Sequence, residues 1–397
     1  MSVLTRFKAF DNLLSHLFCS MKNICFSANT SWYLYNFRRN TILEFKRRGY
    51  RIFCVAPLDD YSQRLADELG VTFIPLDMDN AGNHPVKDLK TAWDLFKIYR
   101  QCKPLVVFQF TIKNNIYGTL AARALGIPVA NNISGLGTAF IHTGLVGRIV
   151  RGLYKISQPF AYQVFCQNSE DQELLVTHKL VKADKLTLLP GSGVDLKRFK
   201  PVELPPAPDR FRFLYVGRML GDKGLRELVE AFAMLKQKGV SAELKLVGFA
   251  DAKNKTAITR EELKSWEEQY GIEWLGSSDT IEEILARADC VVLPSYREGL
   301  PRSLLEACAM ALPVIATDVP GCRSVVTHYE NGILCQAKDP VSLYDAMMAM
   351  INLPEQTRRE MGQKGLEHVT RNYCKTLVID AYVKVVDSLE HRKLATA

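Results

Sequence analysis

The chain has 397 residues, more than the roughly 250–300 that one hydrophobic core can serve, so its length predicts two domains. Hydrophobic residues make up 47% and charged residues 24% of the sequence, a balance that excludes a largely disordered protein. Apolar runs are too short for a spanning helix or for the core of a secretory signal in residues 1–20. Ten scattered cysteines without a C-x-x-C pair predict reduced thiols in the cytoplasm, and neither disulfides nor a metal site.

The net charge of +8 is distributed unevenly along the chain. Residues 1–195 hold 23 Lys and Arg against 15 Asp and Glu, whereas the remainder holds 28 of each. The excess therefore predicts that the first half faces an anionic lipid surface, a pyrophosphate-linked substrate or nucleic acid. The alternative is that this charge only keeps the protein soluble.

The first part of the chain alternates short apolar runs with helical patterns. Residues 3–18 carry apolar side chains on an approximate helical stripe, so residues 1–20 are expected to form an extension, either an amphipathic membrane-surface helix or a frayed end. Helices are predicted within 37–48, 88–99 and 117–125. Such alternation predicts a parallel sheet with right-handed crossovers. The predicted strands are 23–28, 51–56, 71–75, 105–110, 129–133 and 162–166.

Residues 201–209 form a proline-rich break, after which a second series begins. Two doubly wound, Rossmann-like α/β domains in tandem are therefore expected, with a ligand cleft between their strand carboxyl ends. A helix with apolar spacing over 377–389 closes the chain and is expected to pack back onto the protein. The strands of the second series are predicted at 211–216, 242–247, 272–275, 290–293, 313–316 and 332–334.

Two carboxylates follow the fourth strand of the second series. Glu298 and Gly299 lie in a loop, Pro301 suits the first position of a helix, and Glu306 lies over a turn inside that helix. The helix start and the backbone N–H groups of Gly299 and Leu300 predict an anion site for a diphosphate. The carboxylates can accept hydrogen bonds from the paired hydroxyls of a sugar and a ribose. The alternative is two solvated helix carboxylates, but Glu306 lies in an apolar stretch and needs a partner there.

A cationic loop follows the first strand of the second series. Gly217, Arg218, Lys223 and Gly224 stand between that strand and the next helix. A forked guanidinium and an ammonium can bind a pyrophosphate and stabilise it as it leaves, as magnesium does at other sites. The alternative is an exposed loop that happens to carry two cations.

Taken together, Arg218, Lys223, the Glu298–Glu306 pair and residues 313–321 resemble the retaining glycosyltransferases of family 4. Four further segments resemble a bacterial subgroup that builds capsule, O-antigen and lipid-linked glycans and includes N-acetylgalactosaminyltransferases acting on undecaprenyl-diphosphate sugars. The resemblance extends from about residue 23 to 382 and implies the GT-B fold. The four segments are 32–38, 111–118, 131–139 and 189–195.

The resemblance implies a role for each matching position. Residues 21–203 would bind the acceptor, residues 204–374 would bind the donor, and the helix 375–397 would pack back on the first domain. In the donor domain, Arg218 and Lys223 would bind the diphosphate, Glu298 the sugar hydroxyls and Glu306 the ribose. Further donor contacts are implied for Gly217, Gly276, Gly299 and Leu300.

Two departures from the family pattern fall in the acceptor domain. A histidine common in relatives after the strand at 129–133 is absent, and the loop 27–32 lacks the usual paired glycines. The acceptor-side candidates are therefore other polar or flexible residues that are expected to face the cleft. They are Asn29, Lys113, Asn114, Ser134 and Gly135.

These features predict an enzyme that moves a hexose or N-acetylhexosamine from a UDP-sugar to a lipid-linked saccharide, with retention and without metal or cofactor. It would act at the cytoplasmic surface of the inner membrane, where Arg148, Arg151 and Lys155 would contact lipid; an ordinary half-buried helix is the alternative for these three. A nucleotide-sugar epimerase and a non-catalytic two-lobed sugar-binding protein remain alternatives. No recognised nucleic-acid-binding module accompanies the positive charge, so nucleic acid is not an expected partner.

Overall fold

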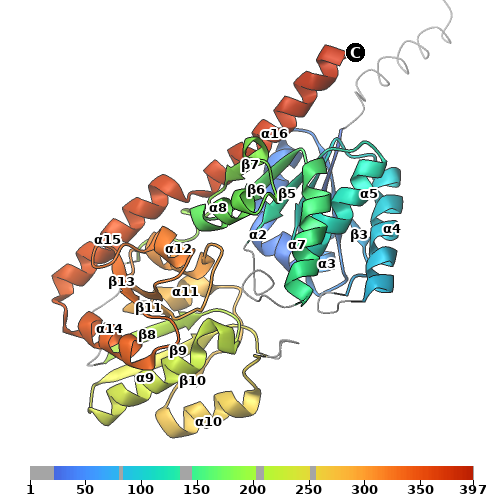
Figure 1. Ribbon diagram of the computed structural model, residues 1–397. Coiled ribbons are helices and arrows are strands. Elements are labelled where there is room, and N and C mark those ends of the chain that lie inside the picture. Colours follow the sequence, from blue (N-terminus) through green and yellow to red (C-terminus); the bar gives the residue numbers. More distant parts are fainter. Residues whose placement is uncertain (1–21, 80–83, 135–144, 203–209, 251–255, 397) are drawn as a thin grey trace, which may run out of the picture. The chain divides into compact units, whose positions relative to one another are not determined.

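The computed structural model describes residues 22–79, 84–134, 145–202, 210–250 and 256–396, and it contains two parallel sheets (Figure 1). The predicted extension at residues 1–20 lies outside the described residues. Each sheet places its first strand between its second and fourth, the arrangement of a doubly wound Rossmann-like fold. Both predicted sheets are therefore present.

The first sheet has seven strands in the order β3-β2-β1-β4-β5-β6-β7. The four pairs among β1 to β5 are parallel. Strands β1, β2, β4 and β5 are almost entirely buried, as a sheet covered by helices on both faces requires, whereas the edge strand β3 is partly exposed. The short β7 was not predicted, because two of its three residues are exposed and it lacks an apolar run. The strands are β1 (Asn23–Ser27), β2 (Arg51–Ala56), β3 (Thr72–Pro75), β4 (Val106–Phe110), β5 (Val129–Ile133), β6 (Gln163–Cys166) and β7 (Leu186–Leu188).

The helices of this part begin and end at recognisable signals. Helix α2 starts six residues earlier than predicted, because Thr30 caps it by accepting a hydrogen bond from the Tyr33 N–H group at 3.1 Å. A π-helical turn, η1, stands where an ordinary helix start was expected. The elements are α2 (Ser31–Arg47), α3 (Tyr61–Leu69), α4 (Pro85–Cys102), η1 (Asn114–Gly118), α5 (Thr119–Ala124), α7 (Leu145–Ser157), η2 (Gln158–Phe160), α8 (Ser169–Thr177) and η3 (Ala183–Lys185).

The second sheet has six strands in the order β10-β9-β8-β11-β12-β13, and all five pairs are parallel. All six predicted strands of this series are present. They are β8 (Phe211–Val216), β9 (Ala242–Val247), β10 (Glu273–Trp274), β11 (Cys290–Leu293), β12 (Val314–Thr317) and β13 (Gly332–Cys335).

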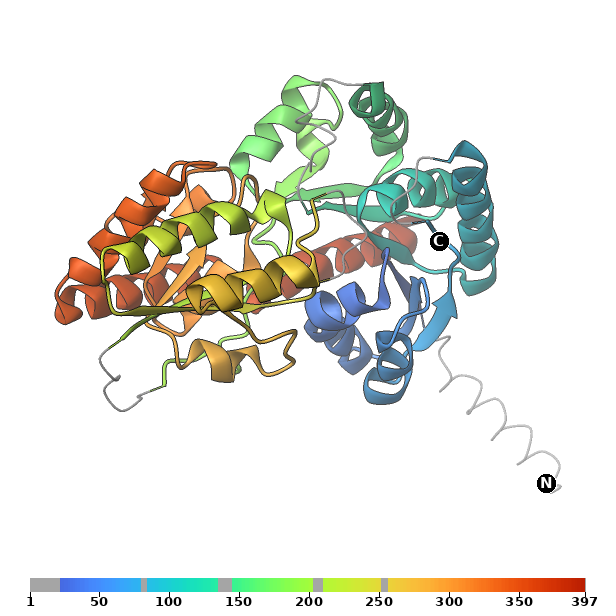
Figure 2. The ribbon, with the colours of Figure 1, turned by 90° about the horizontal axis from the view of Figure 1, so that it is seen from below.

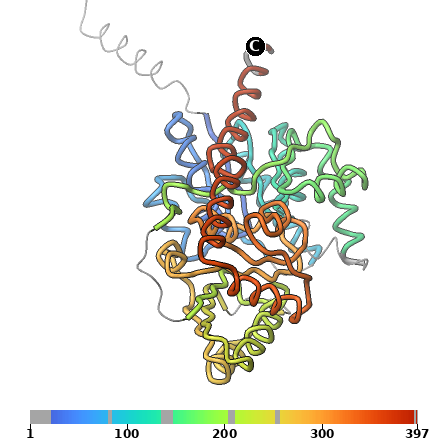
Figure 3. Tube along the Cα trace, turned by 90° about the vertical axis from the view of Figure 1, so that its left-hand side faces the viewer, coloured from blue at the N-terminus to red at the C-terminus, as the bar shows by residue number. Residues whose placement is uncertain are grey.

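Helices cover the second sheet: α9 packs beside α10 and α14, while α12 packs against α15 (Figures 1 and 2). Figure 3 follows the chain through α15 into the long terminal helix α16. The elements are η4 (Gly221–Lys223), α9 (Leu225–Gln237), α10 (Arg260–Tyr270), α11 (Ile281–Leu285), α12 (Arg302–Ala309), α13 (Cys322–Val325), α14 (Pro340–Asn352), α15 (Glu355–Asn372) and α16 (Lys375–Thr396).

The contacts divide the chain into two compact units. One gathers the residues up to Asn132, Ile156–Val164 and the residues from Tyr382 onward; the other gathers Ile133–Lys155 and Phe165–Ala381. Within the first unit, helix α16 is held by a hydrogen bond from the Tyr382 hydroxyl to the Asn132 side chain and by an ion pair between Glu390 and Lys22. The domain bounds drawn from the sequence stay a prediction.

Nine cysteines lie in the described residues, all are unpaired, and eight of them are buried. They occupy core positions in both sheets and their helices, as their apolar neighbours in the sequence indicate. Among the helices of the described part, none combines the length and apolar character needed to cross a bilayer.

Candidate functional site

The predicted cationic loop follows β8 as expected. We call residues 217–224 the Lys223 loop. Arg218 is exposed, and Lys223 ends the short helix η4. Gly224 has a φ of 71°, and a side chain at this position would collide with the carbonyl oxygen of Pro294. Glycine at 224 therefore permits the Lys223 loop to approach the segment after β11 closely.

That second segment, residues 294–301, carries Glu298 and is called the Glu298 loop here. Lys223 Nζ and a Glu298 carboxylate oxygen form an ion pair, and their side chains are 20% and 13% exposed. The Tyr296 N–H group also donates to the Asp222 carbonyl oxygen at 3.0 Å. Two residues separated by 75 positions in the sequence thus meet, as the predicted site requires.

Helix α12 begins at Arg302, so Pro301 precedes the helix and is not its first residue as predicted. The first N–H groups of the helix that reach a carbonyl are those of Leu304 and Leu305, which both donate to Pro301. In the described part of the chain the N–H groups of Gly299 and Leu300 donate to no backbone carbonyl. Unpaired N–H groups at a helix start are the donors that an anion needs.

Glu306 is buried inside α12, with a residue exposure of 6%. Burial raises the pKa of its carboxyl above the ordinary value, and the nearby Arg302 opposes that rise. Arg302 Nε lies 2.6 Å from the Glu306 carboxylate. The carboxylate that the sequence placed in an apolar stretch therefore has the partner that burial demands.

Three glycines follow the neighbouring strands β8, β9 and β10. A side chain at Gly248 would collide with the Gly217 carbonyl oxygen, and the Gly248 N–H group donates to the Gly276 carbonyl at 2.8 Å. This edge of the sheet therefore presents main chain, without side chains, beside Arg218. Gly217 and Gly276 were predicted as donor contacts, whereas the analysis of the sequence missed Gly248.

Three further residues, which no pattern in the sequence indicated, hold the Glu298 loop. Arg297 Nη2 lies 2.5 Å from a carboxylate oxygen of Asp171, and Asn168 Nδ2 donates to the Gly299 carbonyl at 2.8 Å. Asn168 and Asp171 open helix α8, where an Asn followed three residues later by an acid is an ordinary helix start. Such a pattern indicates a helix cap and gives no sign of a partner more than a hundred residues away.

Ser134, predicted on the acceptor side, directly adjoins the Glu298 loop. A side chain at Gly299 would collide with the Ser134 carbonyl oxygen. The structure therefore brings one acceptor-side candidate next to a predicted donor-binding residue. Gly135 lies outside the described residues.

The other acceptor-side candidates belong to the first sheet and are held by their own neighbours. Asn29 follows β1 and is half-buried. Lys113 forms a 2.7 Å ion pair with Asp88, and its side chain is 18% exposed. Asn114 is fully buried and accepts a hydrogen bond from Ser27 Oγ at 2.6 Å. Acceptor contact by these residues stays a prediction.

Thr111 and the π-helical turn η1 mark this edge of the first sheet as unusual. Thr111 has a φ of 72°, a conformation that residues other than glycine seldom adopt. Asn114 Nδ2 donates to Thr111 Oγ1 at 3.2 Å, which helps to hold the turn. Left-handed backbone and π-turns both concentrate at functional sites, and neither has a reliable signal in a single sequence.

The predicted membrane cations lie along one helix, α7. Arg148 and Lys155 are exposed and Arg151 is half-buried. Ile149 and Ile156 are exposed on the same helix, at 53% and 59%. The helix thus presents cations and apolar side chains together.

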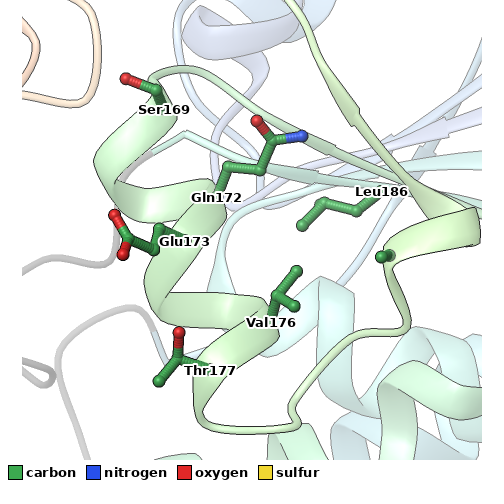
Figure 4. Close-up of a pocket in the computed structure, with 7 residues that line it drawn as sticks. Ser169, Gln172, Glu173, Val176, Thr177 and Leu186 are labelled. Carbon is green, nitrogen blue, oxygen red and sulfur yellow. The ribbon is translucent and has the colours of Figure 1, made fainter.

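A pocket of about 300 Å³ is lined by residues of α8, by Ala183 and by Leu186 at the start of β7 (Figure 4). Its lining includes neither the Lys223 loop nor the Glu298 loop. We assign it no part in the chemistry.

Two family models match the chain in succession. Residues 23–168 match the family described as glycosyl transferase 4-like, and residues 197–368 match the family described as glycosyl transferases group 1. The second match contains Arg218, Lys223, Glu298 and Glu306.

Two curated relatives are similar over most of their length. The N,N'-diacetylbacillosaminyl-diphospho-undecaprenol alpha-1,3-N-acetylgalactosaminyltransferase of Campylobacter jejuni is 28% identical over 89% of this chain and 95% of its own. The UDP-Gal:alpha-D-GlcNAc-diphosphoundecaprenol alpha-1,3-galactosyltransferase of Escherichia coli is 26% identical over 84% and 85%.

Solved structures share the fold at lower identity. HepE of Anabaena in complex with UDP superposes with a TM-score of 0.73 at 16% identity, over 92% of this chain and 100% of that one. Sucrose-phosphate synthase of Thermosynechococcus elongatus superposes with a TM-score of 0.76 at 19% identity, over 94% and 100%. With two Rossmann-like sheets, the joined Lys223 and Glu298 loops and both family matches, the chain belongs to the family 4 glycosyltransferases of GT-B fold.

Proposed function

We propose that this glycosyltransferase moves a hexose or N-acetylhexosamine from a UDP-sugar to an undecaprenyl-diphosphate-linked saccharide, with retention at the transferred carbon. The observation that carries the proposal is the Lys223–Glu298 pair beside the unpaired N–H groups of Gly299 and Leu300. This arrangement supplies a cation and main-chain donors for a diphosphate, next to a carboxylate for sugar hydroxyls.

The acceptor class follows from the relatives. Both curated relatives are named for an acceptor in which undecaprenol diphosphate carries a sugar, and the transferred sugar is N-acetylgalactosamine in one and galactose in the other. Those names differ in the donor sugar and agree in the lipid, so we propose the lipid class and leave the choice between the two sugars to experiment.

Retention is proposed to follow from a front-face displacement. The acceptor oxygen forms its bond to the anomeric carbon on the side from which the diphosphate oxygen departs with the electron pair of the old bond. The acceptor proton passes to that departing diphosphate oxygen. Lys223 and Arg218 stabilise the growing negative charge, so we propose that the reaction needs no metal.

Glu298 has a second use in this scheme. Before the donor binds, its carboxylate balances Lys223, since neither side chain is more than 20% exposed. A diphosphate can then take over Lys223, which releases the Glu298 carboxylate to accept hydrogen bonds from sugar hydroxyls. The pair thereby avoids leaving a half-buried charge alone in the empty site.

A nucleotide-sugar panel tests the donor. UDP-N-acetylgalactosamine, UDP-galactose, UDP-glucose and GDP-mannose are compared by thermal shift, because a ligand bound only by the folded state raises the melting temperature. The best donor is then incubated with undecaprenyl-diphosphate N-acetylglucosamine, with and without EDTA. An α-linked product formed in EDTA supports the proposal.

Other outcomes would contradict specific parts of it. A β-linked product contradicts retention, and loss of activity in EDTA that magnesium restores contradicts the metal-free step. A changed sugar in the absence of acceptor would indicate an epimerase, and binding without any turnover would indicate a sugar-binding protein.

We also propose that the protein binds the cytoplasmic membrane surface through helix α7. Residues 95–169 contain no Asp or Glu, although Lys97 and Lys113 form ion pairs with Asp94 and Asp88 outside this stretch. On α7, exposed isoleucines lie beside cations, which suits anionic headgroups over an apolar layer. The cations of the stretch are Lys97, Arg100, Lys103, Lys113, Arg123, Arg148, Arg151 and Lys155.

Vesicle flotation tests this surface. Charge reversal of Arg148 and Lys155 should release the protein from vesicles containing anionic lipid, because each cation near such a surface contributes about 1 kcal/mol. The control is charge reversal of Lys264 and Lys364, which are exposed in the electrically neutral half. Equal flotation of both double variants would contradict the assignment of α7.

A further inference from the structure

We infer that Asp171 is a positioning residue that holds the Glu298 loop in its donor-binding form through Arg297. The inference rests on the proposed function of that loop. It is carried by two contacts that join the start of helix α8 to the residues on either side of Glu298, and by a third that links Asn168 to Asp171 within that start.

The Asp171 side chain is 1% exposed, and both of its carboxylate oxygens have a partner. One carboxylate oxygen accepts from Arg297 at 2.5 Å, and the other accepts from Asn168 Nδ2 at 3.1 Å. Because an isolated buried charge is very unfavourable, Arg297 is the partner that makes the carboxylate tolerable at this place.

Capping of α8 does not account for this carboxylate. The cap is formed by Asn168 Oδ1, which accepts from the Asp171 backbone N–H group at 2.7 Å. Any residue at position 171 would supply that N–H group. A buried ion pair is also seldom more stable than well-packed apolar side chains, so stability alone gives no reason for a charge here.

Asn168 fixes the opposite side of Glu298. It is 2% exposed, and its amide donates both to Asp171 and to the Gly299 carbonyl at 2.8 Å. Positions 297 and 299 are therefore both bound to the start of α8. Glu298 lies between them, with its side chain held by Lys223.

The contacts of Asp171 with Arg297 and of Asn168 with Gly299, which we call the α8 clasp, also orient the main-chain donors of the site. With the Gly299 carbonyl bound to Asn168 and its Cα against the Ser134 carbonyl, the peptide that follows has little freedom. That peptide carries the Leu300 N–H group, one of the two proposed diphosphate donors. Preorganised donors are effective because they need no rearrangement during the reaction.

Amide hydrogen exchange, which needs no ligand, tests whether the α8 clasp keeps the Glu298 loop closed. In Asp171→Asn, we expect the Tyr296 N–H group, which donates to the Asp222 carbonyl, to exchange about 10-fold faster as the loop opens locally. Exchange in β8 and β9 should be unchanged. The control is Glu170→Gln, which removes a surface pair with Arg323 from the same turn of α8.

The effect of loop positioning on sugar transfer is tested by steady-state kinetics with the donor that the nucleotide-sugar panel selects. Asp171→Asn should lower kcat/KM about 10- to 100-fold, because a small displacement of a binding group has an effect of this size. In a Glu298→Gln background the same change should lower it less than about 3-fold, since Asp171 acts through that loop. Arg297→Lys keeps the positive charge and loses the forked guanidinium, so it should shift both measurements in the same direction. This variant replaces Asp171→Asn in the test if Asp171→Asn folds poorly.

The outcomes separate the two claims. If the exchange rates and kinetics of Asp171→Asn equal those of Glu170→Gln, the positioning role of Asp171 is overturned. Full additivity with Glu298→Gln overturns it as well, because that result indicates a general loss of structure. Normal transfer by Glu298→Gln alone would instead overturn the proposed function of the loop.

Discussion

The first six strands of both sheets follow the same order, but the residues at the carboxyl ends of the strands differ between the two sheets. At the first sheet, polar side chains fill the edge and bond to each other: Ser27 with Asn114, and Tyr382 with Asn132, all buried. At the second sheet, glycines occupy the strand ends, and the charged residues Lys223 and Glu298 keep part of their surface exposed.

This difference indicates different uses of the same fold. Most polar side chains at the first edge bond to one another, although Nε and Nη1 of the buried Arg38 and Oδ1 of Asn115 have no hydrogen-bond partner in the described part of the chain. The second edge leaves main-chain N–H groups and partly exposed charges available, and these are what a diphosphate needs. We therefore expect a substitution in the bonded pairs of the first edge to change stability and leave UDP binding unchanged, and one at the second edge to change catalysis.

The largest effect is expected at the second edge. Lys223→Ala or Glu298→Ala should lower transfer about 100- to 1000-fold, the usual result of removing one preorganised charge stabiliser. The circular dichroism spectrum should stay that of the native fold. Steady-state transfer with the selected donor measures the effect, and Lys245→Ala, which breaks a surface pair with Glu273, is the control. Near-normal turnover in both variants would remove the site assignment.

An intermediate effect is expected at the first edge. Asn114→Ala leaves the Ser27 hydroxyl without its partner in a fully buried place. The free energy of unfolding should fall by about 1–3 kcal/mol. The Kd for UDP, measured by calorimetry, should not change. If UDP affinity fell while stability did not, the contrast between the two edges would be wrong.

The smallest effect concerns Glu306 and depends on pH. Burial raises the pKa of Glu306 above its value in the unfolded chain, so the folded state gains most from this group while it is protonated. That gain in stability is complete at pH values below the pKa of a glutamate in the unfolded chain, about 4.3. It is lost as the pH rises through the higher pKa of Glu306 in the folded chain.

Glu306→Gln never ionises, so its melting temperature relative to the wild type should rise across that pH window and then level off. Melting curves from pH 4 to 8 measure this, with Glu360→Gln, at an exposed position of α15, as the control. The variant should bind UDP more weakly at pH values where the wild-type Glu306 is ionised, because a neutral amide is a weaker hydrogen-bond acceptor for the ribose hydroxyls than a carboxylate. A relative melting temperature that falls as the pH rises would contradict the role of burial.

The fold followed from the sequence because strand runs and turn residues repeat in the same order twice. All twelve predicted strands are present, and β7 alone was missed, since three residues without an apolar run carry no periodic signal. The start of α2 was placed too late because the pattern began at Phe37, whereas the Thr30 cap lies a full helical turn and more before it.

The approach of the Lys223 loop to the Glu298 loop was predictable, because charges in glycine-containing loops have few structural explanations, and binding of a donor there stays a prediction. Lys223 and Glu298 meet as expected, although Pro301 stands before the helix and not in it. Asp171, Arg297 and Gly248 could not be found in this way, because their roles come from partners distant in the sequence. The left-handed Thr111 and the π-turn η1 depend likewise on packing that no local pattern encodes.

The buried cysteines give each compact unit its own natural reporter of opening. Burial raises the thiol pKa of Cys102 to about 11 in one unit and that of Cys308 to about 12 in the other. Such thiols react slowly with alkylating reagents in the native state, because the thiolate is the reactive form. Mass-spectrometric labelling rates in rising denaturant would therefore follow the unfolding of the two halves separately, with no engineered probe.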